Sequence, residues 1–177
     1  VCHCSPTLAG LKTGSLFSCP YSSQKMIIKE IREFNQKLTQ KGIRIIPVRI
    51  SDKRMLVYVY RPEKLKEDFS DEKTQIILKC KGYDCTNLSQ CICRLIQKLQ
   101  SDPDFPHEIG LFLGYPAEDV KGFIENKAAC SKCSGCWKVY GDEQAARILF
   151  KKYKKCTEIY CRRWKSGVAV EQLTITI

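Results

Sequence analysis

Apolar residues recur every three or four positions in several segments of the chain. The first such stripe, Ile27, Ile31, Phe34 and Leu38, follows Ser22 and Ser23 and precedes Gly42. A serine before the stripe and a glycine after it are typical helix boundaries, so this pattern predicts one amphipathic helix. Comparable patterns predict further helices near Pro62, after Ser70, after Asn87, from Pro116 and after Asp142.

The period changes to that of a strand after the first helix. Residues 43–50 and 55–60 are rich in β-branched and aromatic side chains, and polar residues 51–54 separate them. This arrangement predicts a hairpin, in which Pro47 makes the first strand an edge strand or bulges it. Residues 109–113 and 137–140 predict two further short strands.

These elements predict one α+β domain over residues 1–177, with a small, mostly antiparallel sheet covered by several helices. We expect a loop-rich opening at residues 1–20 and a basic helical segment at residues 142–165. No apolar run approaches the ~20 residues that a membrane span requires. A membrane is therefore not an expected partner.

Composition adds two unusual features to this picture. The 177 residues include 12 cysteines, and 30 Lys and Arg against 19 Asp and Glu give a net charge of +11. A chain of this length can bury a core without disulfides, and several cysteines fall inside predicted helices as packing residues. We therefore expect a reducing, cytoplasmic location in which clustered cysteines are thiols or metal ligands.

Several segments together resemble a known family. Residues 106–116 (Pro-His-Glu-Ile-Gly-Leu-Phe-Leu-Gly-Tyr-Pro) and 56–61 (Leu-Val-Tyr-Val-Tyr-Arg) carry the resemblance, and residues 4–12 and 136–142 add to it. They are similar to domain-of-unknown-function family 3793, an uncharacterised family of anaerobic Gram-positive bacteria. The resemblance covers essentially the whole chain. It implies a cytosolic protein of an anaerobe. It assigns no activity, cofactor or catalytic residue to the chain.

The strongest metal-binding pattern is Cys130, Cys133 and Cys136, two successive Cys-x-x-Cys steps. Three thiolates at this spacing can converge on an iron–sulfur cluster or on zinc, with Cys156 or another distant cysteine (Cys161, Cys2 or Cys4) as fourth ligand. If Cys156 and Cys161 lie on one helix, their side chains are about 140° apart and cannot share a metal. The alternative is thiols in a lysine-flanked loop. Metal binding is the leading functional hypothesis.

A second hypothesis, from a different class, is a thiol-dependent enzyme. His107 beside Glu108 can serve as a general base, Cys4 as its nucleophile, and Lys12 as the group that holds an anionic substrate. Lys12 can also lower the pKa of Cys4. In the simpler alternative, His107 and Glu108 bond to nearby backbone groups and Lys12 is solvated.

Gly110, Gly114 and Tyr115 form a candidate ligand-binding segment next to this pair. Glycines allow a ligand to approach the backbone closely, although they also mark bulges and turns. The segment is therefore either part of a binding site or a turn.

A third hypothesis rests on charge. Residues 147–165 contain eight Lys or Arg and a single acid, Glu158, with aromatic residues between them. Such a stretch can bind nucleic acid or an acidic protein, or be the solvated face of a helix. The sequence specifies neither the reaction, if any, nor the oligomeric state.

Overall fold

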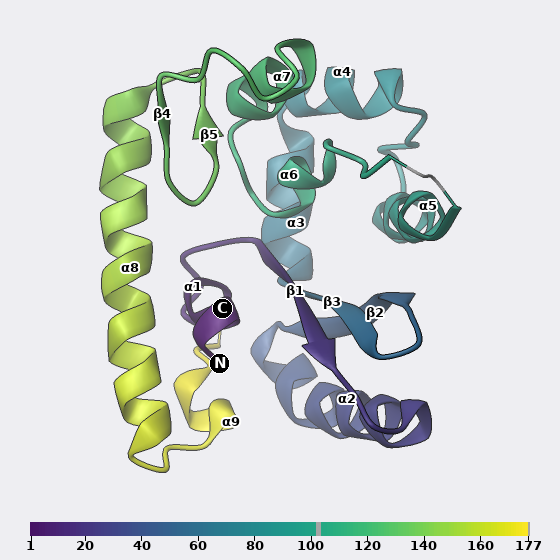
Figure 1. The fold of residues 1–177 in the computed structure, drawn as a ribbon, viewed down its shortest axis with the longest axis vertical. Coiled ribbons are helices and arrows are strands. Elements are labelled where there is room, and N and C mark those ends of the chain that lie inside the picture. Colours follow the sequence, from purple (N-terminus) through teal and green to yellow (C-terminus); the bar gives the residue numbers. More distant parts are fainter. Residues whose placement is uncertain (102–103, 177) are drawn as a thin grey trace. The chain divides into compact units, whose positions relative to one another are not determined.

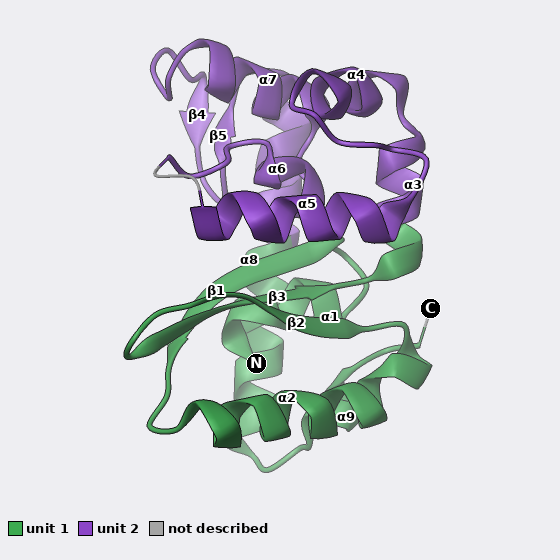
Figure 2. Ribbon diagram, turned by 90° about the vertical axis from the view of Figure 1, so that its right-hand side faces the viewer, with its two compact units in different colours: residues 1–64, 153–177 green, residues 65–152 purple. Residues whose placement is uncertain are grey.

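The computed structural model describes residues 1–101 and 104–176, which form an α+β fold (Figure 1). The chain divides into two compact units (Figure 2). Unit 1 comprises residues 1–64 and 153–177, and unit 2 comprises residues 65–152.

A three-stranded antiparallel sheet forms the centre of unit 1. Strands β1 (Gly14–Pro20), β2 (Arg44–Ile50) and β3 (Arg54–Tyr60) lie in the order β1-β3-β2. The predicted hairpin is confirmed as β2 and β3. Pro47 lies on an edge strand, and the register shifts between Pro47 and Arg49, as expected for a residue without a backbone N–H.

The opening segment is more ordered than the sequence predicts. Instead of a loop-rich stretch, residues 1–20 contain η1 (Cys2–Cys4), α1 (Ser5–Leu8) and strand β1. The prediction was wrong for β1 because this strand is stabilised by pairing with β3, about forty residues away, and not by a local pattern.

Helix α2 (Gln24–Leu38) packs on one face of the sheet (Figure 1). Ile31 and Leu38 of its apolar stripe are buried with Val57 and Val59 of β3. The short helix η2 (Thr39–Lys41) then ends at Gly42, whose φ of 73° is the left-handed conformation expected of a C-cap glycine.

Arg61 joins three separate parts of unit 1. The side chain is 2% exposed, and its guanidinium donates to the carbonyl oxygens of Thr7, Leu8, Lys41 and Ile175 at 2.7–3.1 Å. These acceptors lie in or next to α1, η2 and α9 (Val170–Leu173). A buried cation that donates to four backbone carbonyl oxygens is a structural element, and no sequence pattern predicted it.

Unit 2 is mostly helical. Its elements are α3 (Pro62–Ser70, which begins in unit 1), α4 (Glu72–Cys80), α5 (Leu88–Ser101), α6 (Ile109–Phe112), α7 (Ala117–Glu125) and the short hairpin β4 (Cys133–Ser134) with β5 (Lys138–Val139). In α5, Cys91 is buried and Cys93 is exposed, because two residues along a helix separate their side chains by about 200°.

Residues 109–113 form a helical turn and not the predicted strand. The Leu113 N–H donates to the Ile109 carbonyl at 3.1 Å, the i→i−4 bond of an α-helix. A short, wholly apolar run has no period, so buried strand and buried helix cannot be distinguished from it.

Helix α8 (Glu143–Lys165) is continuous, with residues 143–152 in unit 2 and 153–165 in unit 1. Tyr153 and Cys156 of its predicted apolar stripe are buried. Cys156 and Cys161 both lie on this helix, so their side chains are about 140° apart around its axis and cannot bind the same metal ion.

Candidate functional site

Gly110 brings two helices of unit 2 close together. A Cβ added to Gly110 would lie 2.7 Å from Val120 Cγ2 of α7 and 3.1 Å from the Tyr115 ring. Gly114 has a different role, since its φ of 75° ends α6 in the left-handed conformation. Gly110 therefore serves close packing, and Gly114 forms the turn that directs the chain to Tyr115 and α7.

Asp119, in the first turn of α7, holds the β4–β5 hairpin. Its side chain is 2% exposed, and Oδ2 accepts from Trp137 Nε1 at 2.6 Å. Oδ1 accepts from the backbone N–H groups of Tyr140 and Gly141 at 2.7 and 2.8 Å. One carboxylate therefore fixes both the Trp137 side chain and the end of the hairpin.

Trp137 is the centre of an aromatic cluster. Its ring stacks on Tyr115 with centroids 4.7 Å apart and meets Phe150 of α8 edge-on at 4.6 Å. Both distances are within the range in which aromatic pairs are favourable. The cluster and Asp119 together make this wall of unit 2 rigid.

A cavity of about 460 Å³ lies beside this wall. Its aromatic lining comes from Phe105, Tyr115, Phe123 and Trp137, and Gly110 also borders it. Its polar lining consists of His107, Asp119, Ser134, Cys136 and Lys138. The volume is within the range of small-molecule sites, and an apolar wall with a few polar groups is their usual composition.

The structure brings four predicted site residues to this cavity: His107, Gly110, Tyr115 and Cys136. The His107 ring is exposed and packs edge-on against Phe123, with centroids 5.0 Å apart. Lys138, which the sequence analysis did not select, donates to the Ala128 carbonyl. His107 and Cys136 come from segments almost thirty residues apart, and no local pattern indicates that they line one space.

Glu108 belongs to a buried polar cluster next to the cavity. Its Oε1 accepts from Lys98 Nζ at 2.7 Å and from the Tyr83 hydroxyl at 3.1 Å. Burial alone would raise the pKa of Glu108, but the hydrogen bonds from Lys98 and Tyr83 and the charge of Lys98 outweigh it and lower this pKa. Glu108 is thus an ionised structural partner of Lys98.

We expect the contribution of Glu108 to stability to depend on pH. Because the pKa is lowered in the folded protein, the contribution is present above the unfolded value of 4.5 and is lost as the pH falls through the folded value. At pH 7, Glu108→Gln lowers the free energy of unfolding by about 2–4 kcal/mol, since Lys98 loses its buried partner. Urea unfolding of the wild type and of Glu108→Gln at pH 7 and pH 3.5 measures how much the substitution lowers the free energy of unfolding at each pH.

Glu125→Gln is the matched control, because the Lys121–Glu125 ion pair at 3.8 Å is exposed and contributes little. An effect of Glu108→Gln that is equally large at pH 3.5 contradicts the assignment.

The predicted metal ligands are dispersed. Cys130 is exposed in the loop before the hairpin, with a φ of 58°. Cys133 is half-buried at the start of β4, and Cys136 lines the cavity. Cys156 is buried in unit 1. Within residues 1–101 and 104–176, no three His, Cys, Asp or Glu side chains are grouped to hold a metal ion.

The predicted nucleophile Cys4 lies in unit 1, whereas His107 and Glu108 belong to unit 2. Burial raises the pKa of Cys4 to about 11, although Lys12 acts in the opposite direction, as the sequence predicts. A thiol with this pKa is protonated at neutral pH, which does not favour a nucleophile.

Cys2 and Cys161 are joined by a disulfide, with Cα atoms 5.6 Å apart. The expectation of thiols or metal ligands in place of disulfides was therefore wrong for this pair. The bond links η1 to α8 across a sequence separation of 159 residues, so no local spacing indicated it.

A thiol titration tests these assignments. We expect ten thiols in the unfolded, unreduced protein and twelve after reduction, because one pair of the 12 cysteines is bonded. In the folded protein near pH 7.5, iodoacetamide modifies exposed Cys130 much faster than Cys4. Twelve thiols found by mass mapping without reduction would contradict the disulfide. Modification of Cys4 before Cys130 would contradict the assigned order of thiol reactivity.

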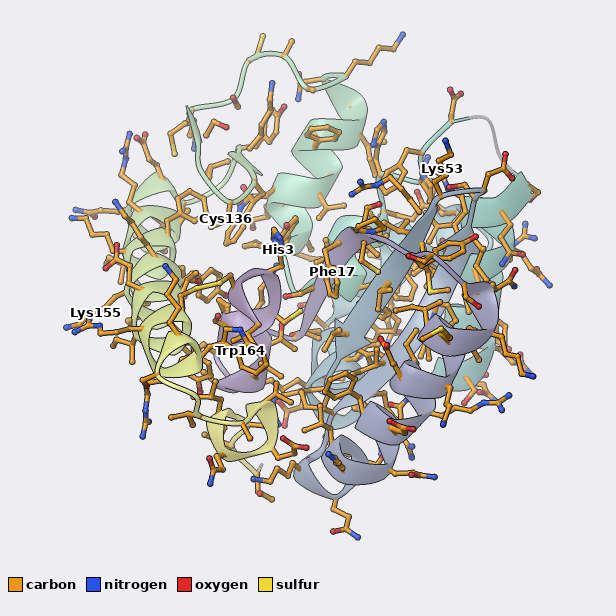
Figure 3. All side chains as sticks on the ribbon, turned by 60° about the horizontal axis from the view of Figure 1, so that its bottom comes forward. His3, Phe17, Lys53, Cys136, Lys155 and Trp164 are labelled. Atoms are coloured by element: carbon orange, nitrogen blue, oxygen red, sulfur yellow. A yellow bond between two sulfur atoms is a disulfide. The ribbon has the colours of Figure 1, made fainter. Side chains whose placement is uncertain are left out.

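The eight basic residues of the stretch 147–165 are all exposed on α8. Lys155, for example, projects away from the helix (Figure 3). Two exposed apolar side chains, Ile148 and Ile159, lie among them. The exposed side of α8 is thus basic and partly apolar.

Comparisons with known proteins complete this description. In the part of the chain that the structure describes, no helix is long and apolar enough to cross a membrane. No curated protein and no solved structure matches the chain. One family model, described as protein of unknown function (DUF3793), matches residues 1–174. Since this match covers nearly all of the 177 residues, the chain belongs to the DUF3793 family.

Proposed function

We propose that the protein binds a small, flat, mostly apolar molecule in the aromatic cavity of unit 2. The observation that carries the proposal is that His107, Gly110, Tyr115 and Cys136, from two distant segments, line one space of about 460 Å³. Asp119 and the Trp137 cluster hold the wall in place, so the cavity is formed before a ligand arrives. A preformed site loses less free energy on binding than a site that must be ordered.

The lining indicates the chemistry of the ligand. Four aromatic side chains offer ring faces and edges, which favour a flat ring system. His107, Ser134 and Cys136 offer a few hydrogen-bonding groups at the wall. The charged atoms of Asp119 and Lys138 are already bonded within the protein, so they do not require an oppositely charged ligand.

A blocking variant tests this proposal. Ser134 is exposed at the cavity wall, so Ser134→Phe places a ring in the cavity without disturbing a buried position. Ala129→Phe is the matched control, since Ala129 is exposed nearby and does not line the cavity. Calorimetric titration with indole and 2-naphthol shows binding to the wild type and Ala129→Phe, and at least tenfold weaker binding to Ser134→Phe. Equal binding by all three proteins, or none by the wild type, contradicts the proposal.

Metal or iron–sulfur binding through Cys130, Cys133, Cys136 and Cys156 stays a prediction supported by the cysteine spacing alone. The dispersed positions of these side chains do not favour it. Metal analysis after anaerobic purification tests it, and substantially less than one equivalent per chain argues against a structural site.

Binding of nucleic acid or an acidic protein is favoured by one observation, the exposure of all eight basic side chains at 147–165. Affinity for a single-stranded DNA oligonucleotide that falls steeply with salt, and that decreases for Lys151→Glu with Lys155→Glu, supports it. Binding that does not depend on salt contradicts an interaction through these basic side chains.

A further inference from the structure

Unit 1 contains a second cleft, of about 310 Å³, between the sheet and the helices around it. Its floor is one face of the sheet, where Phe17 pairs with Val57 and Ile45 pairs with Val59. Its sides are the apolar stripe of α2 and a group from η1, α1, α8 and α9, which includes Cys4, Leu8, Trp164 and Val170.

The core of unit 1 is incompletely packed along this cleft. Phe34 lies on the sheet-facing stripe of α2 and is nevertheless 40% exposed, and Trp164 on the other side is 47% exposed. Phe17 and Ile45 on the floor are only half-buried. At the base of the cleft Ile31 and Leu38 of α2 pack against Val57 and Val59, so the space opens only toward the exposed rings of Phe34 and Trp164. Protein interiors normally leave few voids larger than a water molecule, and a void of this size beside a packed core is suited to a ligand.

Specific bonds fix the elements on both sides of the cleft in place. On α2, Asn35 donates to the Ile45 carbonyl at 2.7 Å and accepts from the Ile45 N–H at 2.9 Å, which fixes the helix at the edge strand. On the other side, the Cys2–Cys161 disulfide ties η1 to α8. Figure 3 shows Trp164 beside the opening turns of the chain, in agreement with their shared place in the lining.

From these observations we propose that this cleft binds a small, uncharged, hydrocarbon-like molecule. Fifteen side chains line it, and Glu30, exposed on α2, is the one carboxylate or basic group among them. The thiol of Cys4 is uncharged at neutral pH because burial keeps it protonated. Glu30 at the rim repels anionic ligands such as fatty acids, and the α-ammonium of Val1, which also lines the cleft, balances its charge. A lining without net charge leaves neutral apolar molecules as the class that fits.

Two substitutions on the same strand test the location of this site. Ile45→Phe places a ring in the cleft, and Ile46→Phe is the matched control, because Ile46 pairs with Tyr58 on the opposite face of the sheet. The probe is 1-aminoanthracene, an uncharged dye that fluoresces when buried, and all proteins carry Ser134→Phe to close the cavity of unit 2. We expect the dye to bind the parent and Ile46→Phe alike and Ile45→Phe at least tenfold more weakly. No binding by the parent, or equal binding by Ile45→Phe, overturns the proposal.

Glu30→Gln tests the charge selectivity and does not depend on a buried substitution. The anionic dye 1-anilinonaphthalene-8-sulfonate binds the parent weakly, and we expect at least fivefold tighter binding to Glu30→Gln, with the affinity for 1-aminoanthracene unchanged. If the anionic dye binds both proteins equally, the assigned ligand class is wrong. If Ile45→Phe does not fold, the change in dye selectivity of Glu30→Gln still tests whether the ligand binds in this cleft.

Discussion

Replacing Arg61 with methionine lowers the free energy of unfolding of unit 1 by about 3–5 kcal/mol. The substitution keeps most of the aliphatic volume but removes the donors to four carbonyl oxygens, those of Thr7, Leu8, Lys41 and Ile175. The Thr7 and Leu8 carbonyls keep one bond each, from the N–H groups of Gly10 and Ile175, but all four carbonyls lose a charged donor. That loss in a buried position is the main cost. Burial also lowers the pKa of Arg61, but the guanidinium stays charged.

The measurement follows each unit through its own tryptophan. Trp137 lies in unit 2 and Trp164 in unit 1, so fluorine NMR of 5-fluorotryptophan-labelled protein in urea reports the two units separately. We expect the Trp164 transition to move to lower urea in Arg61→Met. Arg49→Met is the control, because Arg49 is exposed on the edge strand β2. An Arg61 variant as stable as the Arg49 variant shows that Arg61 does not hold these segments together.

Replacing Asp119 with alanine lowers the free energy of unfolding of unit 2 by about 2–4 kcal/mol and abolishes the binding of indole. The carboxylate accepts from Trp137 Nε1 and from the N–H groups of Tyr140 and Gly141. Without it, these donors lose their acceptor, the hairpin is released from α7, and the wall of the cavity is no longer fixed. Asp119→Asn retains part of the stability because its amide oxygen still accepts.

Glu118→Ala is the control for Asp119. Glu118 is the preceding residue, and it forms an exposed ion pair with Lys73 at 2.6 Å. Surface ion pairs contribute about 0–1 kcal/mol, so this variant unfolds and binds nearly as the wild type does. Should Asp119→Ala bind indole with unchanged affinity, the wall of the cavity does not depend on this carboxylate.

Much of the fold follows from local patterns. The hairpin of β2 and β3 and helix α2 with its Gly42 cap were predicted because each depends on neighbours close in the sequence. Strand β1 and the disulfide between Cys2 and Cys161 were missed because their partners lie far away in the sequence. Helix α6 was mistaken for a strand because four consecutive buried residues show no period.

The candidate site was predicted in part for the same reason. His107, Gly110, Tyr115 and Cys136 were selected as chemically capable residues, but their common cavity depends on tertiary structure. Asp119 was not selected from the sequence. Its hydrogen-bond partners are 18 to 22 residues away, so the sequence contained no local signal for its role.

Nitrogen-15 NMR during an indole titration tests the central claim most directly. The Trp137 Nε1–H lies in the cavity wall, bonded to Asp119, and Gly110 and Tyr115 line the same space. The account predicts saturable shifts of these three residues, with the Trp164 indole signal and the exposed amides of α8 unmoved. Shifts spread over the surface, or none at Trp137, Gly110 and Tyr115, would contradict a ligand site in this cavity.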